Sequence, residues 1–420
     1  MHRITALHSS ISSHVTLPLS KSIVNRLLVI NQVSGGGFSD KLDAEANDIV
    51  VLQRMLQRIN SEKGNTDSPI EINVGNAGTV MRFLTALLAI TPGKWLITGT
   101  PRMQQRPIKP LADALQQLGA EISFTDKSGF PPVYVKGNER LNGGSVRVDA
   151  AISSQYISAL MMIAPVLKGG LNIELQGGIT SGAYILMTQA LMQKAGINVE
   201  FNDNTIRIPE GKYQKFDFIA LAEPDWSAAA FWFEIVALSQ PAEVFLKGLK
   251  VNSVQGDRVL TEIYENLGVT TQFTEEGLLL TKSGNEIAKE FNYDFTECPD
   301  LAQAVIVTCA ALGVRGRFAG LKTLRIKETD RITALKNELS KLGYNIEVVD
   351  NDILLNGGIQ PLQAHPETVI VKCYDDHRMA MAFAPLAIIR SDISIDDPQV
   401  VNKSYPGFWR DIEKVGIAIL

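Results

Sequence analysis

ALQQLGAEISF (114–124) is a helical stretch that ends at a glycine and continues as an alternating strand, and the pattern recurs in LMQKAGINVEF (191–201), IYENLGVTTQF (263–273), ELSKLGYNIEV (338–348) and IEKVGIAIL (412–420). Glycine readily adopts the left-handed conformation that ends a helix, so each segment predicts a helix, a turn and a strand. The five glycines lie 72 to 77 residues apart, at Gly119, Gly196, Gly268, Gly343 and Gly416. This period predicts a repeated unit, of which 420 residues would hold five to six.

The segments between these repeats also combine helices with strands. VYVKG (133–137), LNIELQG (171–177) and AEVFLKG (242–248) are short segments with alternating or β-branched residues. Strands interleaved with helices predict an α/β protein. LQRMLQRIN (52–60) has the helical pattern without a clean glycine stop, so we expect the first copy to end differently. No GxGxxG loop follows a strand and no GxxxxGK[ST] loop occurs, which disfavours a nucleotide-binding fold.

The length and composition indicate a globular protein with two domains. A chain of 420 residues exceeds the size at which one hydrophobic core keeps growing. The net charge of −5 argues against a general nucleic-acid binder. The N-terminal segment has no apolar signal region, and the longest apolar runs are shorter than the ~18 residues of a membrane span. We therefore expect a cytoplasmic protein with no nucleic-acid or membrane partner.

The three cysteines, Cys298, Cys309 and Cys373, form no CxxC pair. They predict reduced, buried thiols rather than a disulfide framework or a zinc site. Cys373 lies close to a charged motif, so a reactive role is the alternative for that thiol.

The segment LPLSKSIVNR (17–26) predicts an anion site at the start of a helix. Ser20 can cap a helix that begins near Lys21. The backbone N–H groups of a helix start, together with Lys21, Ser22 and Arg26, would favour an anion. The alternative is a capped amphipathic helix with two solvated cations, and the spacing alone does not separate the two.

Further segments could hold a ligand close to the backbone or to a rigid cation. In VGNAGTVMRF (74–83), small residues allow close approach at Gly78 and Asn76 supplies an amide. PRMQQRPI (101–108) holds Arg106 next to a proline, and a stiff segment loses less entropy on binding a carboxylate or phosphate. The hydroxyl clusters SSQY (153–156) and TSGAY (180–184) would cap helices or donate to phosphate oxygens.

Three charged motifs follow in the second half of the chain. RIKETDRI (325–332) places Lys327 and Arg331 four residues apart, on one face of a helix or turn, although a solvated ion-paired helix is the alternative. YDDHRMAMAFAPLAI (374–388) puts Arg378 at the start of an apolar helix, where the helix dipole opposes it unless an anion binds. NKSYPGF (402–408) adds Lys403 beside a Pro-Gly turn.

In this order, the motifs LP-x-SKS-x-x-NR, GNAGT-x-MR, PRM-x-x-RPI, SSQ, KETDR and DHRMAM resemble the enolpyruvyl transferases of the shikimate pathway. The resemblance runs from Leu17 to about Pro406. It implies an α/β (α+β) fold of two similar domains, each made of three βαβαββ-type units, that is, an inside-out α/β barrel with six units in all. The domains would be 21–222, on the shikimate 3-phosphate side, and 1–20 plus 223–420, with the active site in the cleft between them.

The resemblance implies an enzyme that transfers the enolpyruvyl (carboxyvinyl) group of phosphoenolpyruvate to the 5-hydroxyl of shikimate 3-phosphate and releases phosphate. The reaction would proceed by addition and elimination through a tetrahedral intermediate, as a step of chorismate and aromatic amino acid biosynthesis. We expect a monomer whose partners are these two small molecules, with no cofactor and no metal. The resemblance also implies that glyphosate would occupy the phosphoenolpyruvate site, for which Gly78 leaves room.

The resemblance assigns roles to individual positions. The catalytic residues would be Lys21, Asp300 and Glu328. Shikimate 3-phosphate would be contacted by Lys21, Ser22, Arg26, Ser153, Ser154, Gln155, Ser181, Tyr184, Asp300 and Lys327. Phosphoenolpyruvate would be contacted by Lys21, Asn76, Gly78, Arg106, Gln155, Arg331, Arg378 and Lys403. Asp300 could accept the hydroxyl proton, whereas the proton that C3 gains could come from Lys21 or from Glu328, and the sequence leaves both open.

Two departures and two rival functions accompany the resemblance. Leu19 stands where the family usually has glycine, and Phe83 stands where many members have proline. An enolpyruvyl transferase acting on UDP-N-acetylglucosamine would carry a loop cysteine, but the first cysteine here is Cys298. A non-catalytic descendant that only binds phosphorylated metabolites is disfavoured because the catalytic lysine and carboxylates are intact.

Overall fold

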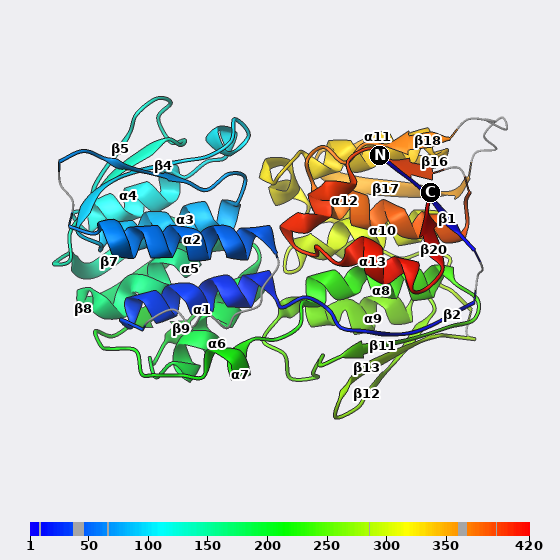
Figure 1. Ribbon diagram of the computed structural model, residues 1–420, viewed down its shortest axis with the longest axis horizontal. Coiled ribbons are helices and arrows are strands. Elements are labelled where there is room, and N and C mark those ends of the chain that lie inside the picture. The colour runs from blue at the N-terminus through cyan, green and yellow to red at the C-terminus, as the bar shows by residue number, and fades with distance from the viewer. Residues whose placement is uncertain (8–9, 37–45, 65–66, 285, 360–367, 392) are drawn as a thin grey trace. The chain divides into compact units, whose positions relative to one another are not determined.

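The computed structural model describes residues 1–7, 10–36, 46–64, 67–284, 286–359, 368–391 and 393–420 (Figure 1). The chain forms two compact units, which we call unit 1 (residues 1–20 and 223–420) and unit 2 (residues 21–222). The chain therefore passes from one unit to the other twice, after Ser20 and after Ala222.

Two four-stranded sheets are described in unit 2. One has the order β3 (Ile70–Asn73), β4 (Gly93–Thr98), β6 (Val133–Gly137), β5 (Glu121–Phe124). The other has the order β7 (Asn142–Asp149), β8 (Lys168–Gln176), β10 (Thr205–Ile208), β9 (Glu200–Asn202). Along β8, buried Leu171, Ile173 and Leu175 alternate with exposed residues, as expected for a sheet that covers a core on one face.

Three further four-stranded sheets are described in unit 1. The first has the order β2 (Ile11–Val15), β11 (Ala242–Lys247), β13 (Gly277–Lys282), β12 (Val269–Phe273). The second has the order β14 (Tyr293–Asp294), β15 (Gly316–Ala319), β17 (Asp352–Ile359), β16 (Tyr344–Val349). The third has the order β18 (Val369–Val371), β19 (Ile393–Ile395), β1 (His2–Ala6), β20 (Ile417–Ile419).

All five sheets share one topology. In each, the first two strands are parallel and the remaining neighbours are antiparallel, as in β3–β4–β6–β5. The repeated glycines each precede the edge strand that ends this order, and their φ values are +90°, +84°, +84°, +83° and +81°. The prediction that Gly119, Gly196, Gly268, Gly343 and Gly416 end helices in the left-handed conformation is therefore confirmed.

The last sheet is completed by the N-terminal strand. In four sheets the edge strand after the glycine pairs with the strand that follows it in sequence, but β20 ends at Ile419 and pairs with β1. Ile4 of β1 faces Ile393 of β19 on one side and Ile419 of β20 on the other, and its side chain is fully buried. The two ends of the chain thus share one repeat.

The helices complete the pattern. In unit 2 they are α1 (Lys21–Val33), α2 (Asn47–Glu62), α3 (Gly78–Ala89), α4 (Lys109–Gln117), α5 (Ser154–Ile163), α6 (Gly182–Lys194) and α7 (Phe218–Leu221). In unit 1 they are α8 (Trp226–Leu238), α9 (Leu260–Glu265), α10 (Ala302–Ala311), α11 (Arg331–Lys341), α12 (His377–Phe383) and α13 (Phe408–Glu413). The 3-10 helices are η1 (Met103–Gln105), η2 (Ala164–Val166), η3 (Gly256–Val259), η4 (Pro299–Leu301), η5 (Lys322–Ile326), η6 (Ala384–Ile388) and η7 (Pro398–Lys403).

Each unit is built around three buried helices. In unit 2, α1, α3 and α5 pack against one another, and in unit 1, α8, α10 and α12 do so. Helices α3, α5, α8, α10 and α12 are apolar nearly all round, which is typical of a helix with no solvent face, whereas α1 also buries the polar residues Asn25 and Arg26. The few less buried residues of α3, α5 and α8 include Thr79, Gln155 and Ser227, each in the first turn. Buried and outer helices alternate six times along the described chain, in agreement with six repeated units.

The first copy ends differently from the other five, as expected. Helix α2 continues to Glu62, and its C-cap residue Lys63 is extended, with φ −57° and ψ 139°. Gly64 follows with a φ of +86°, but its N–H donates to the Pro92 carbonyl rather than back to the helix.

The three cysteines are buried, as predicted. Burial raises the pKa of Cys298 to about 12 and that of Cys373 still further above its usual value, so both remain thiols at neutral pH. Among the described residues, no helix has the length and apolar character required to cross a bilayer. Within the same residues, no three His, Cys, Asp or Glu side chains form a group suited to hold a metal ion.

Glu234 is an unusual buried group in the core of unit 1. Its side chain on α8 is fully buried, and neither carboxyl oxygen has a hydrogen-bond partner among the described residues. Burial raises its pKa well above the usual value, so the folded protein holds this group protonated. Unfolding releases the proton once the pH exceeds about 4.3, so the free energy of unfolding should fall as pH rises from there toward the folded pKa.

We expect Glu234→Gln to remove this pH dependence. The variant should match the parent in thermal stability near pH 4 and exceed it at pH 8, since each pKa unit of the shift corresponds to about 1.4 kcal/mol. Thermal unfolding of both proteins between pH 4 and pH 8 measures the difference. Glu262→Gln, at an exposed position on α9, is the matched control and should show no such trend. A constant stability difference across this range would contradict the assignment.

Candidate active site

The candidate residues of unit 2 lie mostly at helix starts. Lys21 and Ser22 begin α1, Asn76 and Gly78 lie at the start of α3, and Ser181 precedes α6. Backbone N–H groups at helix starts have no partner within the helix and attract anions. Unit 2 therefore presents hydroxyl, amide and ammonium groups where a phosphate or carboxylate is favoured.

The start of α5 combines capping with a link to α3. Ser153 is the N-cap residue, and its side chain accepts a hydrogen bond from the Gln155 backbone at 3.2 Å, which confirms the capping prediction for SSQY (153–156). The N-cap residue of α6, Ser181, makes no such side-chain bond. The Gln155 side chain donates to Thr79 Oγ1 at 3.3 Å, and Ser154 is buried. The N-terminal turns of α3 and α5 are thus adjacent.

Arg106 lies directly against Gly78. A Cβ atom at Gly78 would lie 2.5 Å from a terminal nitrogen of the Arg106 guanidinium, closer than any real contact. The guanidinium also donates to the Asn76 carbonyl at 3.5 Å, and Arg106 is 4% exposed. Glycine at position 78 therefore makes room for the cation next to the start of α3.

Arg26 is an internal cation rather than a surface one. Its Nε donates to Thr188 Oγ1 at 2.7 Å, and its terminal nitrogens donate to the Ser22 carbonyl, to Ser158 and to the Tyr184 carbonyl. Burial lowers its pKa to about 10, so it stays charged at neutral pH. Because Arg26 binds the backbone of both Ser22 and Tyr184, it fixes two candidate substrate contacts relative to each other.

Lys21 is paired, but Ser20 does not act as expected. The Lys21 ammonium lies 3.2 Å from the carboxylate of Asp48, the second residue of α2. Ser20 is fully buried, and its hydroxyl has no hydrogen-bond partner among the described residues. The prediction that Ser20 caps α1 was therefore wrong: its backbone N–H is bonded to the Glu223 carbonyl, and the hydroxyl is not used.

Ser181 adopts a strained backbone conformation. Its φ and ψ are 58° and 44°, in the left-handed region that residues other than glycine seldom occupy. Such a conformation costs on the order of 1–3 kcal/mol and often marks a functional position. Tyr184, one turn later, places its ring 5.7 Å from the Arg26 guanidinium.

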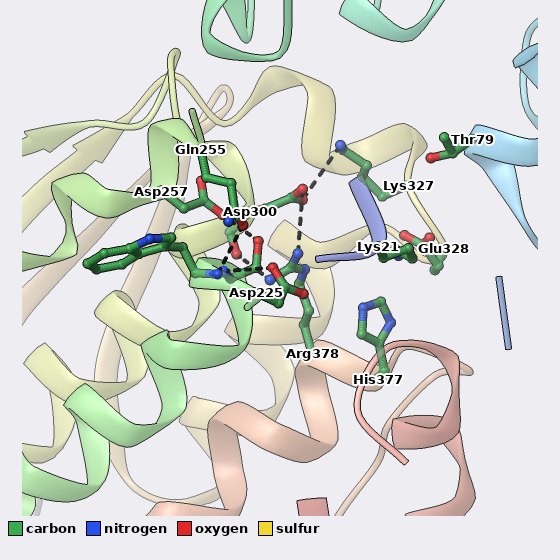
Figure 2. A network of polar contacts seen from close by, with 12 residues as sticks. Lys21, Thr79, Asp225, Gln255, Asp257, Asp300, Lys327, Glu328, His377 and Arg378 are labelled. Atoms are coloured by element: carbon green, nitrogen blue, oxygen red, sulfur yellow. Dashed lines mark hydrogen bonds and ion pairs between the residues drawn. The ribbon is translucent and has the colours of Figure 1, made fainter. Parts of the chain in front are cut away.

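In unit 1 the candidate residues gather around Asp300, which lies in η4 directly before α10. Lys327 Nζ lies 3.7 Å and Arg331 3.1 Å from one carboxylate oxygen, and Arg378 lies 3.5 Å from the other. Figure 2 shows Lys327 and Arg378 directed toward Asp300. Three cations thus surround this carboxylate, which could take a proton from a group placed beside it.

Arg331 is the central cation of this cluster. Its side chain is 2% exposed and contacts Asp376 at 2.7 Å, Glu328 at 3.1 Å and Asp300 at 3.1 Å. Burial acts to lower the pKa of Arg331, but the three carboxylates outweigh burial and raise the pKa above its usual range. The guanidinium is thus permanently charged and holds three carboxylates in fixed positions.

Glu328 connects two segments that are far apart in sequence. One of its carboxylate oxygens contacts Arg331, and the other lies 2.9 Å from Lys403 Nζ, in η7. Lys327 follows η5, whereas Arg331 begins α11 behind the N-cap Asp330. The spacing suggested that Lys327 and Arg331 share one face of a helix or turn, but they do not lie on one helix. Both nevertheless reach Asp300, because the chain turns between them.

The DHR motif (Asp376–Arg378) supplies both the N-cap of α12 and a cation. The Asp376 side chain accepts from the Arg378 backbone at 2.9 Å and so caps α12. Arg378 in turn donates to the Asp300 carbonyl at 2.9 Å. The predicted position of Arg378 at the start of an apolar helix is confirmed, and the unfavourable helix dipole is offset by contacts with Asp300.

A second carboxyl group, Asp257 of η3, lies close to Asp300 (Figure 2). It accepts a short hydrogen bond from the Ser227 hydroxyl in the first turn of α8. Burial, followed by the charge of Asp300, raises the pKa of Asp257 to about 7. A carboxyl group with this pKa can both hold and release a proton at neutral pH.

Comparison with known proteins identifies the family. The family EPSP synthase (3-phosphoshikimate 1-carboxyvinyltransferase) matches residues 42–412 of the chain. The chain belongs to the EPSP synthase family. It is 45% identical over 420 residues to a 3-phosphoshikimate 1-carboxyvinyltransferase of Bacteroides fragilis, covering 100% of this chain and 99% of that protein. A 3-phosphoshikimate 1-carboxyvinyltransferase of Methanospirillum hungatei is 33% identical, over 95% of this chain and 94% of its own length.

Solved EPSP synthase structures share the fold. The EPSP synthase of Acinetobacter baumannii aligns with a TM-score of 0.74 at 20% identity, covering 100% of this chain and 99% of that one. This likeness confirms the expected α/β architecture of repeated units.

The structure explains one of the two departures from the family pattern. Leu19 pairs with Pro224 in an isolated antiparallel bridge, where the two segments that connect the units run side by side within unit 1. Phe83 is fully buried on α3, and its ring centroid lies 5.4 Å from the Arg26 guanidinium. Phe83 thus fills a packed position and helps to hold Arg26, whereas Leu19 is half-buried and nothing in the structure explains a leucine there.

Sequence reasoning missed several partners of the candidate residues. Asp48 pairs with Lys21, Thr188 binds Arg26, and Asp257 adjoins Asp300. None of them has a spacing signal, because each pair is joined only by the fold. Asp376 was within the quoted DHR motif, and its place before a helix could have marked it as an N-cap.

Proposed function

We propose that the protein transfers the carboxyvinyl group of phosphoenolpyruvate to the 5-hydroxyl of shikimate 3-phosphate and releases phosphate. The observation that carries the proposal is the cluster of unit 1, where Asp300 and Glu328 are held by Lys327, Arg331, Arg378 and Lys403. The reaction needs acid and base groups among cations, because the two substrates bring two phosphates and two carboxylates.

The proposed mechanism has two balanced steps. In the addition, the 5-hydroxyl oxygen bonds to C2 of phosphoenolpyruvate, Asp300 takes the hydroxyl proton, and C3 gains a proton. In the elimination, the C2–oxygen bond to phosphate breaks, C3 returns a proton, and the carboxyvinyl ether remains. No redox change occurs in either step.

The ion pairs suggest how the proton at C3 is handled. Lys21 lies against the Asp48 carboxylate, and a lysine ammonium can give a proton. Glu328 lies against two cations, Arg331 and Lys403, and a carboxylate can accept a proton. We therefore assign protonation of C3 to Lys21 and removal of that proton to Glu328.

The remaining contacts are proposed from the family pattern and the local geometry. Shikimate 3-phosphate would bind the hydroxyl and amide groups at the starts of α1, α5 and α6, with Lys327 from unit 1. Phosphoenolpyruvate would bind Asn76, Gly78 and Arg106 in unit 2 and Arg331, Arg378 and Lys403 in unit 1. The reaction thus draws on both units, and the expectation of an active site in the cleft between domains stays a prediction. The same holds for a cytoplasmic monomer.

Phosphate release measured with each substrate pair tests this function. We expect release only when phosphoenolpyruvate and shikimate 3-phosphate are both present, and none when UDP-N-acetylglucosamine replaces shikimate 3-phosphate. Release with the nucleotide sugar would support the rival transferase. Binding of both substrates by the folded protein without any release would support the non-catalytic alternative.

Gly78→Ala should weaken both inhibition by glyphosate and binding of phosphoenolpyruvate. The added methyl group would displace the Arg106 guanidinium, because a Cβ atom there would lie 2.5 Å from it. We expect glyphosate to compete with phosphoenolpyruvate in the parent, and the variant to show at least about ten-fold weaker inhibition with a higher KM for phosphoenolpyruvate, since ~1.4 kcal/mol corresponds to a factor of ten. Gly284→Ala, at an exposed position with no neighbour within 4 Å, is the control. Unchanged inhibition in Gly78→Ala would refute this role for Arg106.

A further inference from the structure

The segment before α12 contains two consecutive residues in a left-handed conformation. Tyr374 and Asp375 have φ values of 55° and 56°, although neither is glycine. Side chains disfavour this region, so the conformation persists only where surrounding contacts enforce it. Asp376, the next residue, is the cap of α12 and the partner of Arg331.

Helix α11 holds this segment at two points. At its first residue, Arg331 contacts Asp376 through two nitrogens, at 2.7 and 3.3 Å. Two turns later, Glu338 accepts hydrogen bonds from the Tyr374 hydroxyl at 2.6 Å and from the Lys372 backbone at 3.0 Å. The strained residues therefore lie between two anchored points of the same helix.

Glu338 is built into this arrangement as a buried acceptor. Its side chain is fully buried, and each carboxylate oxygen receives one of the two hydrogen bonds. Lys341, one turn further along α11, contacts the same carboxylate and donates to the Ile370 carbonyl at 2.9 Å. Burial and the bond to Glu338 raise the pKa of Tyr374 to about 12, so its hydroxyl keeps the proton that it donates.

The consequences of this anchoring reach the candidate active site. The Asp376 backbone N–H donates to the Cys373 carbonyl at 2.9 Å, across the turn that Tyr374 and Asp375 form in their left-handed conformation. The Asp376 side chain accepts from the Arg378 backbone at the start of α12, and the Arg378 guanidinium donates to the Asp300 carbonyl. A change at the Tyr374 hydroxyl, which donates to Glu338 and also contacts the Asn337 side chain, would therefore alter the position of Arg378.

We propose that Glu338 and Tyr374 form a latch that holds residues 372–376 in their strained conformation and thereby positions Asp376 and Arg378 for phosphoenolpyruvate. Both are positioning residues, since the contacts described for Glu338 join it to Lys372, Tyr374 and Lys341 rather than to the residues assigned to substrate. The part of the inference that concerns phosphoenolpyruvate rests on the proposed function. The part that concerns the conformation of the segment does not.

Tyr374→Phe removes the latch hydroxyl with little change in volume. We expect the KM for phosphoenolpyruvate to rise about ten-fold, equivalent to about 1.4 kcal/mol, while the KM for shikimate 3-phosphate and the unfolding temperature change little. Amide hydrogen exchange at Asp376 and Arg378 should accelerate, whether or not the protein is active. Tyr134→Phe, on β6 of unit 2, is the matched control and should alter neither quantity.

A second substitution distinguishes a latch from a general packing role. Asp375→Gly lowers the cost of the left-handed conformation, so it should restore much of the phosphoenolpyruvate affinity in Tyr374→Phe. Asp203→Gly, which relieves a φ of 51° in unit 2, should not. Unchanged exchange and KM in Tyr374→Phe, or equal rescue by both glycines, would overturn the proposal. An inactive parent would instead refute the proposed function, and hydrogen exchange would still decide on the latch.

Discussion

Replacing Asp300 by asparagine is expected to lower kcat about a thousand-fold, within the range of about 10²–10⁴ that a positioned general base contributes. The asparagine side chain has nearly the same size but cannot accept the proton of the 5-hydroxyl. Arg331 would keep its contacts with Asp376 and Glu328, so the cluster should stay assembled. Steady-state phosphate release measures the loss.

The matched control for this substitution is Asp294→Asn. Asp294 lies on β14, close in sequence to Asp300. Its carboxylate accepts a hydrogen bond from the Thr296 backbone N–H at 2.8 Å. This variant should keep the kcat of the parent. A kcat for Asp300→Asn within a factor of a few of the parent, with unfolding behaviour preserved, would rule out Asp300 as the base.

Replacing Arg331 by leucine is expected to destabilise unit 1 by about 3–5 kcal/mol, as is usual when one partner of a buried ion pair is removed. The three carboxylates that Arg331 contacts would lose their shared cation. Because the Arg331 side chain is only 2% exposed, water could not replace it. Chemical denaturation of the parent and the variant measures the loss, and no activity should remain.

Arg317→Leu provides the comparison for a cation at the surface. Arg317 pairs with Asp352, but its side chain is 67% exposed, so we expect a change below about 1 kcal/mol. Equal effects of Arg317→Leu and Arg331→Leu would mean that the buried cluster does not depend on its central cation.

The repeat was visible in the sequence because its signal is local. A glycine that ends a helix leaves the same pattern wherever it occurs, and all five positions have positive φ. The closing of the last sheet by β1 has no local signal, since it joins the two ends of the chain. The position of the helix start in KETDR was also missed, because Asp330 caps the helix through the Thr333 backbone and shifts its start to Arg331.

The candidate site was foreseen through its motifs rather than through its contacts. Lys21, Asp300 and Glu328 could be named from the family pattern. The contacts of Lys21 with Asp48 and of Glu328 with Lys403 could not, because each pair is far apart in the sequence. The strained pair Tyr374–Asp375 was equally hidden, because tyrosine and aspartate do not predict a left-handed backbone. Tertiary contacts enforce such features, and sequence spacing does not record them.

The most direct test of the central claim follows both substrates at once by phosphorus nuclear magnetic resonance. The purified protein is incubated with equal amounts of phosphoenolpyruvate and shikimate 3-phosphate. We predict that the phosphoenolpyruvate signal disappears, that inorganic phosphate appears in equal amount, and that the 3-phosphate ester of shikimate persists as a shifted signal. Phosphate release from phosphoenolpyruvate alone, loss of the 3-phosphate ester, or no change in any signal would contradict carboxyvinyl transfer.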